Sequence, residues 1–236
     1  MQLRLRDAAG LFEVTDQTIA RWVKERSLPA VRISGQYRFN REELLEWATS
    51  RQVRFSARVF AEFARRDQDE APVPALAEAL ATGGIHHGVP GRDQESVLRS
   101  VIERMPLPAE VDRAFFLSVL LARETLGSTG VGNGIAIPHV RNPVVLHVPR
   151  PLITLCFLET AVAFGAPDGE PVHTLFTLVS PTVSTHLKLL SRLAFALHQP
   201  VFAQAIARRS PAATVLTAAA TVDRSTDEVG LGGGRG

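Results

Sequence analysis

The sequence predicts a two-part α/β protein, in which a small, mostly helical module with a β-hairpin precedes a larger α/β domain. Three observations lead to this prediction. The chain has 236 residues, more than the usual one-domain size of about 100 to 200 residues. Helical and strand periodicities alternate along it. Charge is unevenly divided: residues 1–66 contain 13 basic and 8 acidic side chains, net +5, whereas residues 67–236 contain 13 and 16, net −3.

Composition restricts the classes of protein to which the chain can belong. With 45% hydrophobic and 21% charged residues it can bury a core, which excludes a disordered or fibrous protein. Its single cysteine, Cys156, excludes an intramolecular disulfide and a thiolate metal cage. No run of about 18 to 20 apolar residues predicts a membrane span, and the N-terminus lacks the apolar core of a signal peptide. We therefore expect a soluble, cytoplasmic protein without a metal or cofactor.

The first module begins with two predicted helices. A short helix is expected at residues 7–12, and a second over residues 16–26. Thr15 and Asp16 are residue types that cap the start of a helix. The apolar side chains after them recur at the spacing of one helical face: Ile19, Trp22 and Val23.

From residue 31 the apolar period changes from a helical one to the period of two that is typical of strands. Four apolar residues alternate with polar ones around Gly35: Val31, Ile33, Tyr37 and Phe39. This pattern predicts a small hairpin with one apolar face. A third helix is then expected to open at Asn40, with Glu43 at its N3 position, and to bury Leu44, Leu45 and Trp47.

This succession of helix, turn, helix and basic hairpin is a layout that reads DNA, because a helix fits the major groove while nearby arginines neutralise phosphates. The stretch from Leu5 to Trp47 resembles the excisionase-type winged helix-turn-helix of the MerR-like superfamily. The residues that match are Asp7-Ala8-Ala9, Val14-Thr15, Thr18-Ile19, Arg21-Trp22-Val23, Leu28-Pro29, Val31-Arg32, Gly35, Tyr37-Arg38-Phe39 and Glu43-Leu44-Leu45-Glu46-Trp47.

The resemblance implies that residues 16–26 form a recognition helix. On that helix Gln17, Arg21 and Lys24 would reach base edges or phosphates, and Arg32 and Arg38 would lie on the wing. Some excisionase-like modules bind protein partners instead, and this alternative stays open.

Composition also divides the chain. We expect the winged helix-turn-helix domain at residues 1–52 and a helix with a charged linker at residues 53–73, interrupted by prolines. The Phe-rich helix would either pack on the module or form a homodimer. The second domain is expected at residues 74–220, followed by a glycine-rich, disordered tail at residues 221–236.

Within the second domain, several elements can be predicted from periodicity and caps. The adjacent histidines at 86 and 87 fit a surface strand or loop better than a metal site, since neighbours on a strand point to opposite faces. A helix begins after Asp93 and ends at Met105. Another spans residues 110–125, and its predicted stripe is Val111, Phe115, Val119 and Ala122.

A glycine-rich segment, residues 127–134, leads into the short apolar strand Ile135–Ile137. It is not a phosphate-binding loop of the Walker type, because no Gly-Lys-Ser/Thr ends it and because it follows a helix and precedes a strand. It does place His139 at the end of a strand beside glycine amides that side chains do not cover. An imidazole in that position is a candidate nucleophile toward phosphorus.

Arg123-Glu124 and Leu126 to His139 closely resemble the signature of the type 2 enzyme IIA domain of the phosphoenolpyruvate-dependent phosphotransferase system (PTS), in its fructose, mannitol and nitrogen-regulatory branch. The downstream residues that match are Pro151 to Leu158, Phe164, Pro171-Val172, Leu175-Phe176, Val179-Ser180-Pro181 and Thr185 to Ser191. The resemblance implies an α/β sandwich with a mixed sheet flanked by helices. It also implies a phosphohistidine carrier, rather than a stand-alone enzyme, that is charged by an HPr-type phosphocarrier protein.

Three site residues follow from this resemblance. His139 would be the phosphoacceptor through Nε2, Arg123 the arginine that faces it, and His186 a second histidine at the start of a helix running to His198. The residue types suit the chemistry. A guanidinium holds the equatorial oxygens of a metaphosphate-like group, and the amides of a helix N-terminus stabilise an anion.

Finding both modules in one chain favours a DNA-binding regulator whose activity depends on the phosphorylation state of His139, with DNA, the phosphocarrier and a regulatory protein as partners. The alternative is a phosphotransferase subunit that passes its phosphate to a sugar-transporter IIB domain. In that case the N-terminal module would only localise the protein or regulate its own gene.

Overall fold

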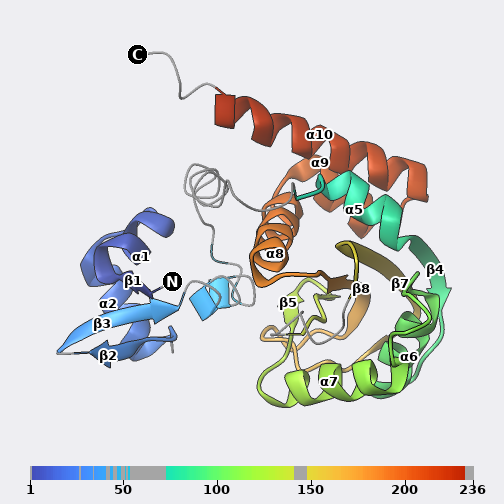
Figure 1. The fold of residues 1–236 in the computed structure, drawn as a ribbon, viewed down its shortest axis with the longest axis horizontal. Helices are drawn as coiled ribbons and strands as arrows, with labels where there is room; N and C mark the ends of the chain where they lie inside the picture. Colours follow the sequence, from blue (N-terminus) through green and yellow to red (C-terminus); the bar gives the residue numbers. More distant parts are fainter. Residues whose placement is uncertain are drawn as a thin grey trace. The chain divides into compact units, whose positions relative to one another are not determined.

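The structure is a computed structural model that describes residues 2–26, 28–33, 35–40, 43–44, 47–48, 51, 53, 73–140 and 148–231 (Figure 1). Two compact units are present, one of residues 1–70 with 226–236 and one of residues 71–225. Within the described part no helix has the length and apolarity to cross a membrane. The predicted helix and linker at residues 53–73 lies outside the described residues, apart from its two ends.

The described residues of the first unit include the helices α1 (Leu5–Leu11) and α2 (Asp16–Glu25) and a three-stranded antiparallel sheet. Its strands are β1 (Gln2–Arg4), β2 (Val31–Ile33) and β3 (Gln36–Asn40), in the order β1-β3-β2. The predicted second helix is confirmed with its cap, since the Thr15 side chain accepts a hydrogen bond from the Thr18 amide at 3.2 Å. A helix beside a small hairpin is therefore the architecture that the sequence indicated.

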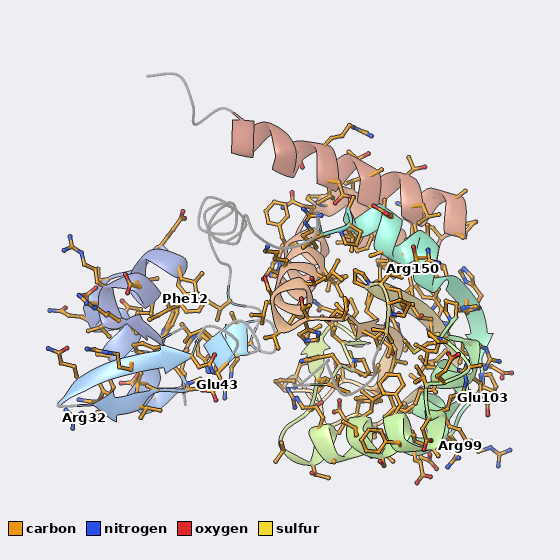
Figure 2. The ribbon with its side chains drawn as sticks, in the orientation of Figure 1. Phe12, Arg32, Glu43, Arg99, Glu103 and Arg150 are labelled. Carbon is orange, nitrogen blue, oxygen red and sulfur yellow. The ribbon has the colours of Figure 1, made fainter. Side chains whose placement is uncertain are left out.

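The core of this unit is aromatic. The ring centroids of Trp22 and Trp47 lie 5.3 Å apart. The ring of Phe12, which is labelled in Figure 2, packs edge-on against both. The indole Nε1 of Trp47 donates to the carbonyl of Arg26 at 3.0 Å. Both tryptophans are buried, so they anchor the core of the module.

The prediction that Val31 shares one apolar face of the hairpin with Tyr37 and Phe39 is wrong. Val31 pairs with Arg38 and Arg32 with Tyr37, and paired residues of an antiparallel ladder share one face of the sheet. Val31 therefore lies on the face opposite Tyr37 and is 58% exposed, whereas Phe39 is buried. Simple alternation along the sequence failed because it was continued from one strand to the next. Across the turn, a residue of β2 and a residue of β3 that share a face differ in number by an odd amount, as Val31 and Arg38 do.

The second unit is built on a five-stranded mixed sheet with the order β4-β7-β8-β6-β5. Its strands are β4 (Ile85–Val89), β5 (Gly130–Gly132), β6 (Ile135–Ala136), β7 (Leu152–Val162) and β8 (Val172–Val179). β4 pairs in parallel with β7, and β6 with β8, whereas the β7–β8 and β5–β6 pairs are antiparallel.

Helices cover both faces of this sheet (Figure 1). They are α5 (Leu76–Gly83), α6 (Gln94–Arg104), α7 (Arg113–Thr125), α8 (Val183–Leu197), α9 (Pro200–Ala207) and α10 (Ala212–Leu231). Alternate residues of β7 enter two separate cores: Leu152 and Cys156 pack with α6 and α7, whereas Ile153 and Leu155 pack with α5, α8, α9 and α10. The predicted α/β sandwich with a mixed sheet flanked by helices is therefore confirmed.

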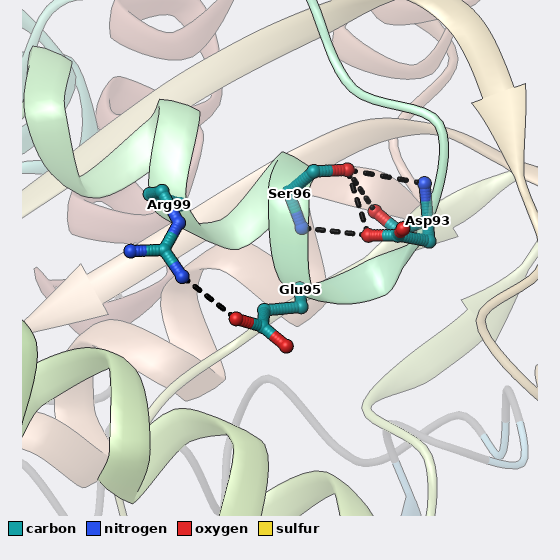
Figure 3. Close-up of polar contacts among 4 residues, drawn as sticks. All are labelled: Asp93, Glu95, Ser96 and Arg99. Atoms are coloured by element: carbon teal, nitrogen blue, oxygen red, sulfur yellow. Dashed lines mark hydrogen bonds and ion pairs between the residues drawn. The ribbon is translucent and has the colours of Figure 1, made fainter.

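Helix α6 begins where the sequence predicted. Asp93 accepts a hydrogen bond from the Ser96 amide at 2.8 Å, and the Ser96 hydroxyl accepts one from the Asp93 amide at 3.2 Å (Figure 3). From the same first turn, Glu95 forms an exposed ion pair of 2.7 Å with Arg99, one turn further along α6. Local caps of this kind can be read from sequence because both partners lie within four residues.

Helix α7 differs from its prediction in its start and in its buried face. It begins at Arg113, after the N-cap Asp112, and its buried side is formed by Phe116, Leu117, Leu120 and Glu124. Phe115, in the predicted stripe, is 47% exposed. Three consecutive apolar residues span about 200° of a helix, so the sequence alone did not show which side meets the sheet.

The expectation of a disordered tail from residue 221 is also wrong as far as residue 231. Helix α10 continues to Leu231, and Val222 is buried in the second core. The Asp223 carboxylate accepts hydrogen bonds of 3.0 Å from the amides of Leu76 and Ala77, at the start of α5. Side-chain contacts from a distant element thus hold a stretch whose composition resembles a tail. Residues 232–236 lie outside the described part.

We expect Asp223→Ala to lower the free energy of unfolding by about 1–3 kcal/mol, because two partly buried amides of α5 lose their acceptor. Urea denaturation measures the change. The exposed Glu110→Ala variant is the matched control and should change stability by less than about 0.5 kcal/mol. Equal stability of the two variants would show that Asp223 does not secure α5.

Candidate active site

The candidate site lies beyond the end of β6. The glycine-rich segment is not only a turn, as the sequence suggested: Gly130–Gly132 form β5, which pairs with β6. Asn133 and Gly134, with φ values of 53° and 69°, make the connection between them. A Cβ atom on Gly134 would lie 2.4 Å from the His173 ring, so the position requires glycine. This hairpin directs the chain toward His139, which bridges in parallel to Leu178 of β8.

The orientation of the His139 ring determines which nitrogen is available for reaction. The side chain is 4% exposed, and its Nδ1 lies 2.7 Å from the carbonyl oxygen of Ile137. A carbonyl oxygen only accepts, so Nδ1 carries the proton in this hydrogen bond. In the neutral ring, Nε2 then has the lone pair, and it is the nitrogen suited to attack an electrophile.

His186 lies beside His139 although 46 residues separate them in the sequence. The two ring centroids are 5.2 Å apart, with an angle of 43° between the ring planes. His186 is 3% exposed and lies in the first turns of α8, whose N-cap Thr182 accepts a hydrogen bond from the Thr185 amide at 3.2 Å. The positive end of the α8 dipole is therefore at the site, where it favours a bound anion.

Arg123 occupies the last turn of α7. Its Nη1 donates to the carbonyl of Gly127 at 2.9 Å, which ties the side chain to the glycine-rich segment. Burial raises the pKa of the Glu124 carboxyl above its usual value, and the nearby Arg123 and His139 side chains partly oppose this rise. Arg123 and His139 are thus both close enough to Glu124 to act on its carboxyl electrostatically.

Glu124 is the site residue to which sequence reasoning assigned no role. It is 9% exposed and accepts hydrogen bonds from the amide of Thr129 at 3.0 Å, the hydroxyl of Thr129 and the Nε2 of Gln94 at 3.3 Å. Burial raises the pKa of its carboxyl, whereas these Thr129 contacts lower it. Its spacing from Leu117 and Leu120 was the available signal, because it places a carboxyl on the buried face of α7.

Three of the other histidines of the described part have separate contacts. The His87 ring stacks on Phe157 at 4.7 Å, and the Nδ1 of His198 lies 2.8 Å from the Ala194 carbonyl. His173 contacts the Thr174 hydroxyl through Nδ1 at 2.8 Å. Cys156 is buried in the sheet, and burial raises the pKa of its thiol to about 12. Cys156 is therefore not a second nucleophile.

In the first unit, the predicted DNA-contacting residues of α2 lie on one face. Gln17, Arg21 and Lys24 follow one another at intervals of four and three residues, and all three are exposed. Ile19 and Trp22 are buried on the opposite side. The helix therefore presents an amide and two cationic groups to solvent.

The two predicted wing arginines lie on opposite faces of the hairpin, as the strand register requires. Arg32, labelled in Figure 2, is exposed and its guanidinium lies 5.3 Å from the Tyr37 ring centroid. Arg38 is half-buried and donates to the Tyr37 carbonyl at 3.1 Å and to the Gln36 side chain at 3.0 Å. Arg32 is the more accessible of the two to a ligand.

Comparison with known families divides the chain in two. Residues 80–218 match the family model described as "Phosphoenolpyruvate-dependent sugar phosphotransferase system, EIIA 2", and residues 3–52 match that of a helix-turn-helix domain. The first match includes Arg123, His139 and His186. The second includes the five predicted DNA-contacting residues.

Individual relatives agree with the first match. A nitrogen regulatory protein of Pseudomonas aeruginosa is 40% identical over 123 residues, which are 50% of this chain and 77% of that protein. The Escherichia coli protein of that name is 38% identical over 105 residues, which cover 44% of this chain and 61% of it. The crystal structure of the nitrogen regulatory protein IIA-Ntr from Neisseria meningitidis superposes with a TM-score of 0.54 and 29% identity, over 61% of this chain and 98% of that one.

Proposed function

The chain belongs, through residues 80–218, to the phosphoenolpyruvate-dependent sugar phosphotransferase system EIIA 2 family, and from this premise we propose that it is a phosphorylation-dependent DNA-binding regulator. In this proposal, His139 accepts a phosphoryl group from an HPr-type phosphocarrier. The observation that supports it most strongly is the pair of buried imidazoles 5.2 Å apart, with the Nδ1 of His139 held by a carbonyl. That arrangement leaves Nε2 as the nucleophile.

The transfer step needs no net change in protons on His139. The Nε2 lone pair forms a bond to phosphorus while the P–N bond of the donor phosphohistidine breaks, and the donor imidazole recovers the electron pair. Negative charge spreads over the three equatorial oxygens during transfer. Arg123, His186 and the N-terminal end of α8 are the groups that would stabilise it.

For the first unit, we propose a winged helix-turn-helix of the excisionase type in the MerR-like superfamily, at residues 1–52. Helix α2 would enter the major groove with Gln17, Arg21 and Lys24, while Arg32 and Arg38 would contact the backbone from the wing. Residues 53–73 would join it to the phosphoacceptor domain at residues 74–220. We place the protein in the cytoplasm, where a phosphocarrier and DNA are both present.

Charge provides the physical link between the two activities. A phosphoryl group adds about −1.5 to −2 charges at pH 7, to a part of the chain that already has a net charge of −3. Residues 1–66, with net +5, are the part that would approach DNA. Phosphorylation of His139 thus changes the electrostatic free energy of any state in which the phosphoacceptor domain is near the DNA or the basic module.

We expect phosphorylation to change the dissociation constant for a mixed-sequence DNA duplex by about tenfold or more at fixed salt, which corresponds to about 1.4 kcal/mol. Fluorescence anisotropy would compare the protein before and after incubation with phosphoenolpyruvate and the general phosphotransferase proteins. The His139→Ala variant, treated in the same way, is the control and should bind equally before and after. Identical affinities of the two wild-type forms would rule out this regulation.

A second candidate function is relay of the phosphate to a IIB domain. It is favoured by one relative, a fructose-specific EIIABC component from Bacillus subtilis, which is 30% identical over 121 residues, 50% of this chain and 19% of that protein. Transfer of label from the phosphorylated protein to a purified IIB domain would support the relay. Stable retention of the label in the presence of that domain would support the regulator.

A further inference from the structure

A continuous series of hydrogen bonds connects Glu124 with the His139 ring. The carboxyl of Glu124 accepts from both the amide and the hydroxyl of Thr129. The carbonyl of Thr129 accepts from the Ile137 amide at 3.0 Å, and the carbonyl of Ile137 accepts from the His139 Nδ1 at 2.7 Å. The series thus runs from His139 through Ile137 and Thr129 to Glu124. At each step the residue farther from the carboxyl donates the hydrogen bond.

The first member of this series is held more firmly than an ordinary surface glutamate. Its side chain projects from the buried face of α7, and Gln94 at the start of α6 supplies a further donor at 3.3 Å. The Thr129 amide, the Thr129 hydroxyl and the Gln94 side chain all donate to the carboxyl, which suits its ionised form. Removing its charge would leave several partly or fully buried donors with a weaker acceptor, and such donors are costly to leave unpaired.

The last member of the series determines the chemistry of the site. The Ile137 carbonyl keeps the proton on Nδ1 and fixes the direction in which Nε2 points. The position of that carbonyl depends on the pairing of Ile137 with Thr129, and Thr129 is secured by Glu124. Hydrogen bonds in such a series also polarise one another. A displacement of Thr129 is thus transmitted to the ring.

We propose that Glu124 is a positioning residue for phosphoryl transfer, which acts through Thr129 and Ile137 to hold His139 in the tautomer with Nδ1 protonated and Nε2 unprotonated. This inference rests on the proposed function of His139. It assigns no contact between Glu124 and the phosphoryl group. It explains why a carboxyl is buried beside a site that must bind an anion, where its charge would otherwise oppose binding.

Two pairs of variants separate positioning from simple loss of structure. Glu124→Gln keeps the volume of the side chain and removes its charge, and Glu95→Gln makes the same change in an exposed carboxyl that pairs with Arg99. Thr129→Val keeps the shape and removes the hydroxyl donor, whereas Thr129→Ser keeps the donor. All four are made in the full chain, and their free energies of unfolding are measured alongside.

The first measurement is ¹⁵N NMR of the neutral His139 imidazole, in which the two ring nitrogens can be distinguished. We expect Glu124→Gln and Thr129→Val to lower the fraction of the ring with Nδ1 protonated, and Glu95→Gln and Thr129→Ser to leave it unchanged. The second measurement is the initial rate of phosphoenolpyruvate-driven phosphorylation. We expect the first two variants to be slower by about 10- to 100-fold, since small displacements of a reacting group have effects of this size.

The outcomes of these measurements are distinct. Wild-type tautomer fractions and rates in a folded Glu124→Gln protein would overturn the positioning role and leave phosphorylation of His139 intact. If Glu124→Gln fails to fold, a wild-type rate and tautomer fraction in Thr129→Val would overturn it. If the wild-type protein is not phosphorylated at all, the proposed function fails, while the tautomer measurement still supports or overturns the effect of Glu124 on the ring.

Discussion

His139→Ala should abolish phosphoenolpyruvate-driven labelling of the protein by an HPr-type phosphocarrier. Alanine has no nucleophile, and the Nε2 of His139 is the nitrogen that the Ile137 hydrogen bond leaves with a lone pair. His139→Gln is the companion variant, because it fills most of the space of a side chain that is buried in the wild type. Labelling is measured with radioactive phosphoenolpyruvate, and its acid lability identifies a phosphohistidine.

The controls for this experiment are histidines with contacts elsewhere. His87→Ala and His198→Ala alter rings that contact Phe157 and Ala194, so they should retain wild-type labelling. Undiminished label in a folded His139→Gln protein would contradict the assignment of His139. The phosphoacceptor would then be another residue. His186, whose ring centroid lies 5.2 Å from that of His139, would be tested first.

Arg123→Ala should lower the initial rate of phosphorylation by about 10³-fold, the effect typical of an arginine that stabilises a transferring phosphoryl group. Arg123→Lys should restore only part of the rate, since an ammonium lacks the planar pair of donors that matches a phosphoryl oxygen pair. The measurement is the initial rate of label incorporation with the phosphocarrier in excess. Arg99→Ala removes an exposed arginine of α6 and should leave the rate unchanged.

Arg123 also contacts the carbonyl of Gly127, so loss of structure must be separated from loss of charge. The free energy of unfolding of each variant is therefore measured with its rate. If Arg123→Ala phosphorylates at the wild-type rate, Arg123 only secures the glycine-rich segment. If Arg123→Lys equals the wild type, a positive charge is sufficient and the guanidinium geometry is unimportant.

Elements whose ends depend on nearby residues were predicted well. Helix α2 starts after Thr15 and α6 after Asp93, because each cap bonds an amide three residues later. Predictions that required a choice of face were less successful. The buried side of α7 includes Phe116 rather than Phe115, and Val31 lies on the solvent face of the hairpin. Such choices depend on what packs against the element, which periodicity does not specify.

The candidate site shows the same division. The resemblance on which His139, Arg123 and His186 were selected lies in continuous motifs, and the structure places the two histidine rings in contact. Glu124 received no role from the sequence, although it stands in the same motif as Arg123. Its partners Thr129 and Gln94 lie five residues after it and thirty before it, and only the fold brings all three together.

The sequence by itself determined that this protein has a basic module of helices and a hairpin followed by an α/β domain with a histidine at a strand end. It did so because caps, periodicity and charge are properties of neighbouring residues. The tertiary structure alone decided which nitrogen of His139 carries the proton, which carboxyl ends its series of hydrogen bonds and which face of α7 is buried. Those features depend on backbone carbonyls and side chains that meet only when the strands pair and the helices pack on the sheet.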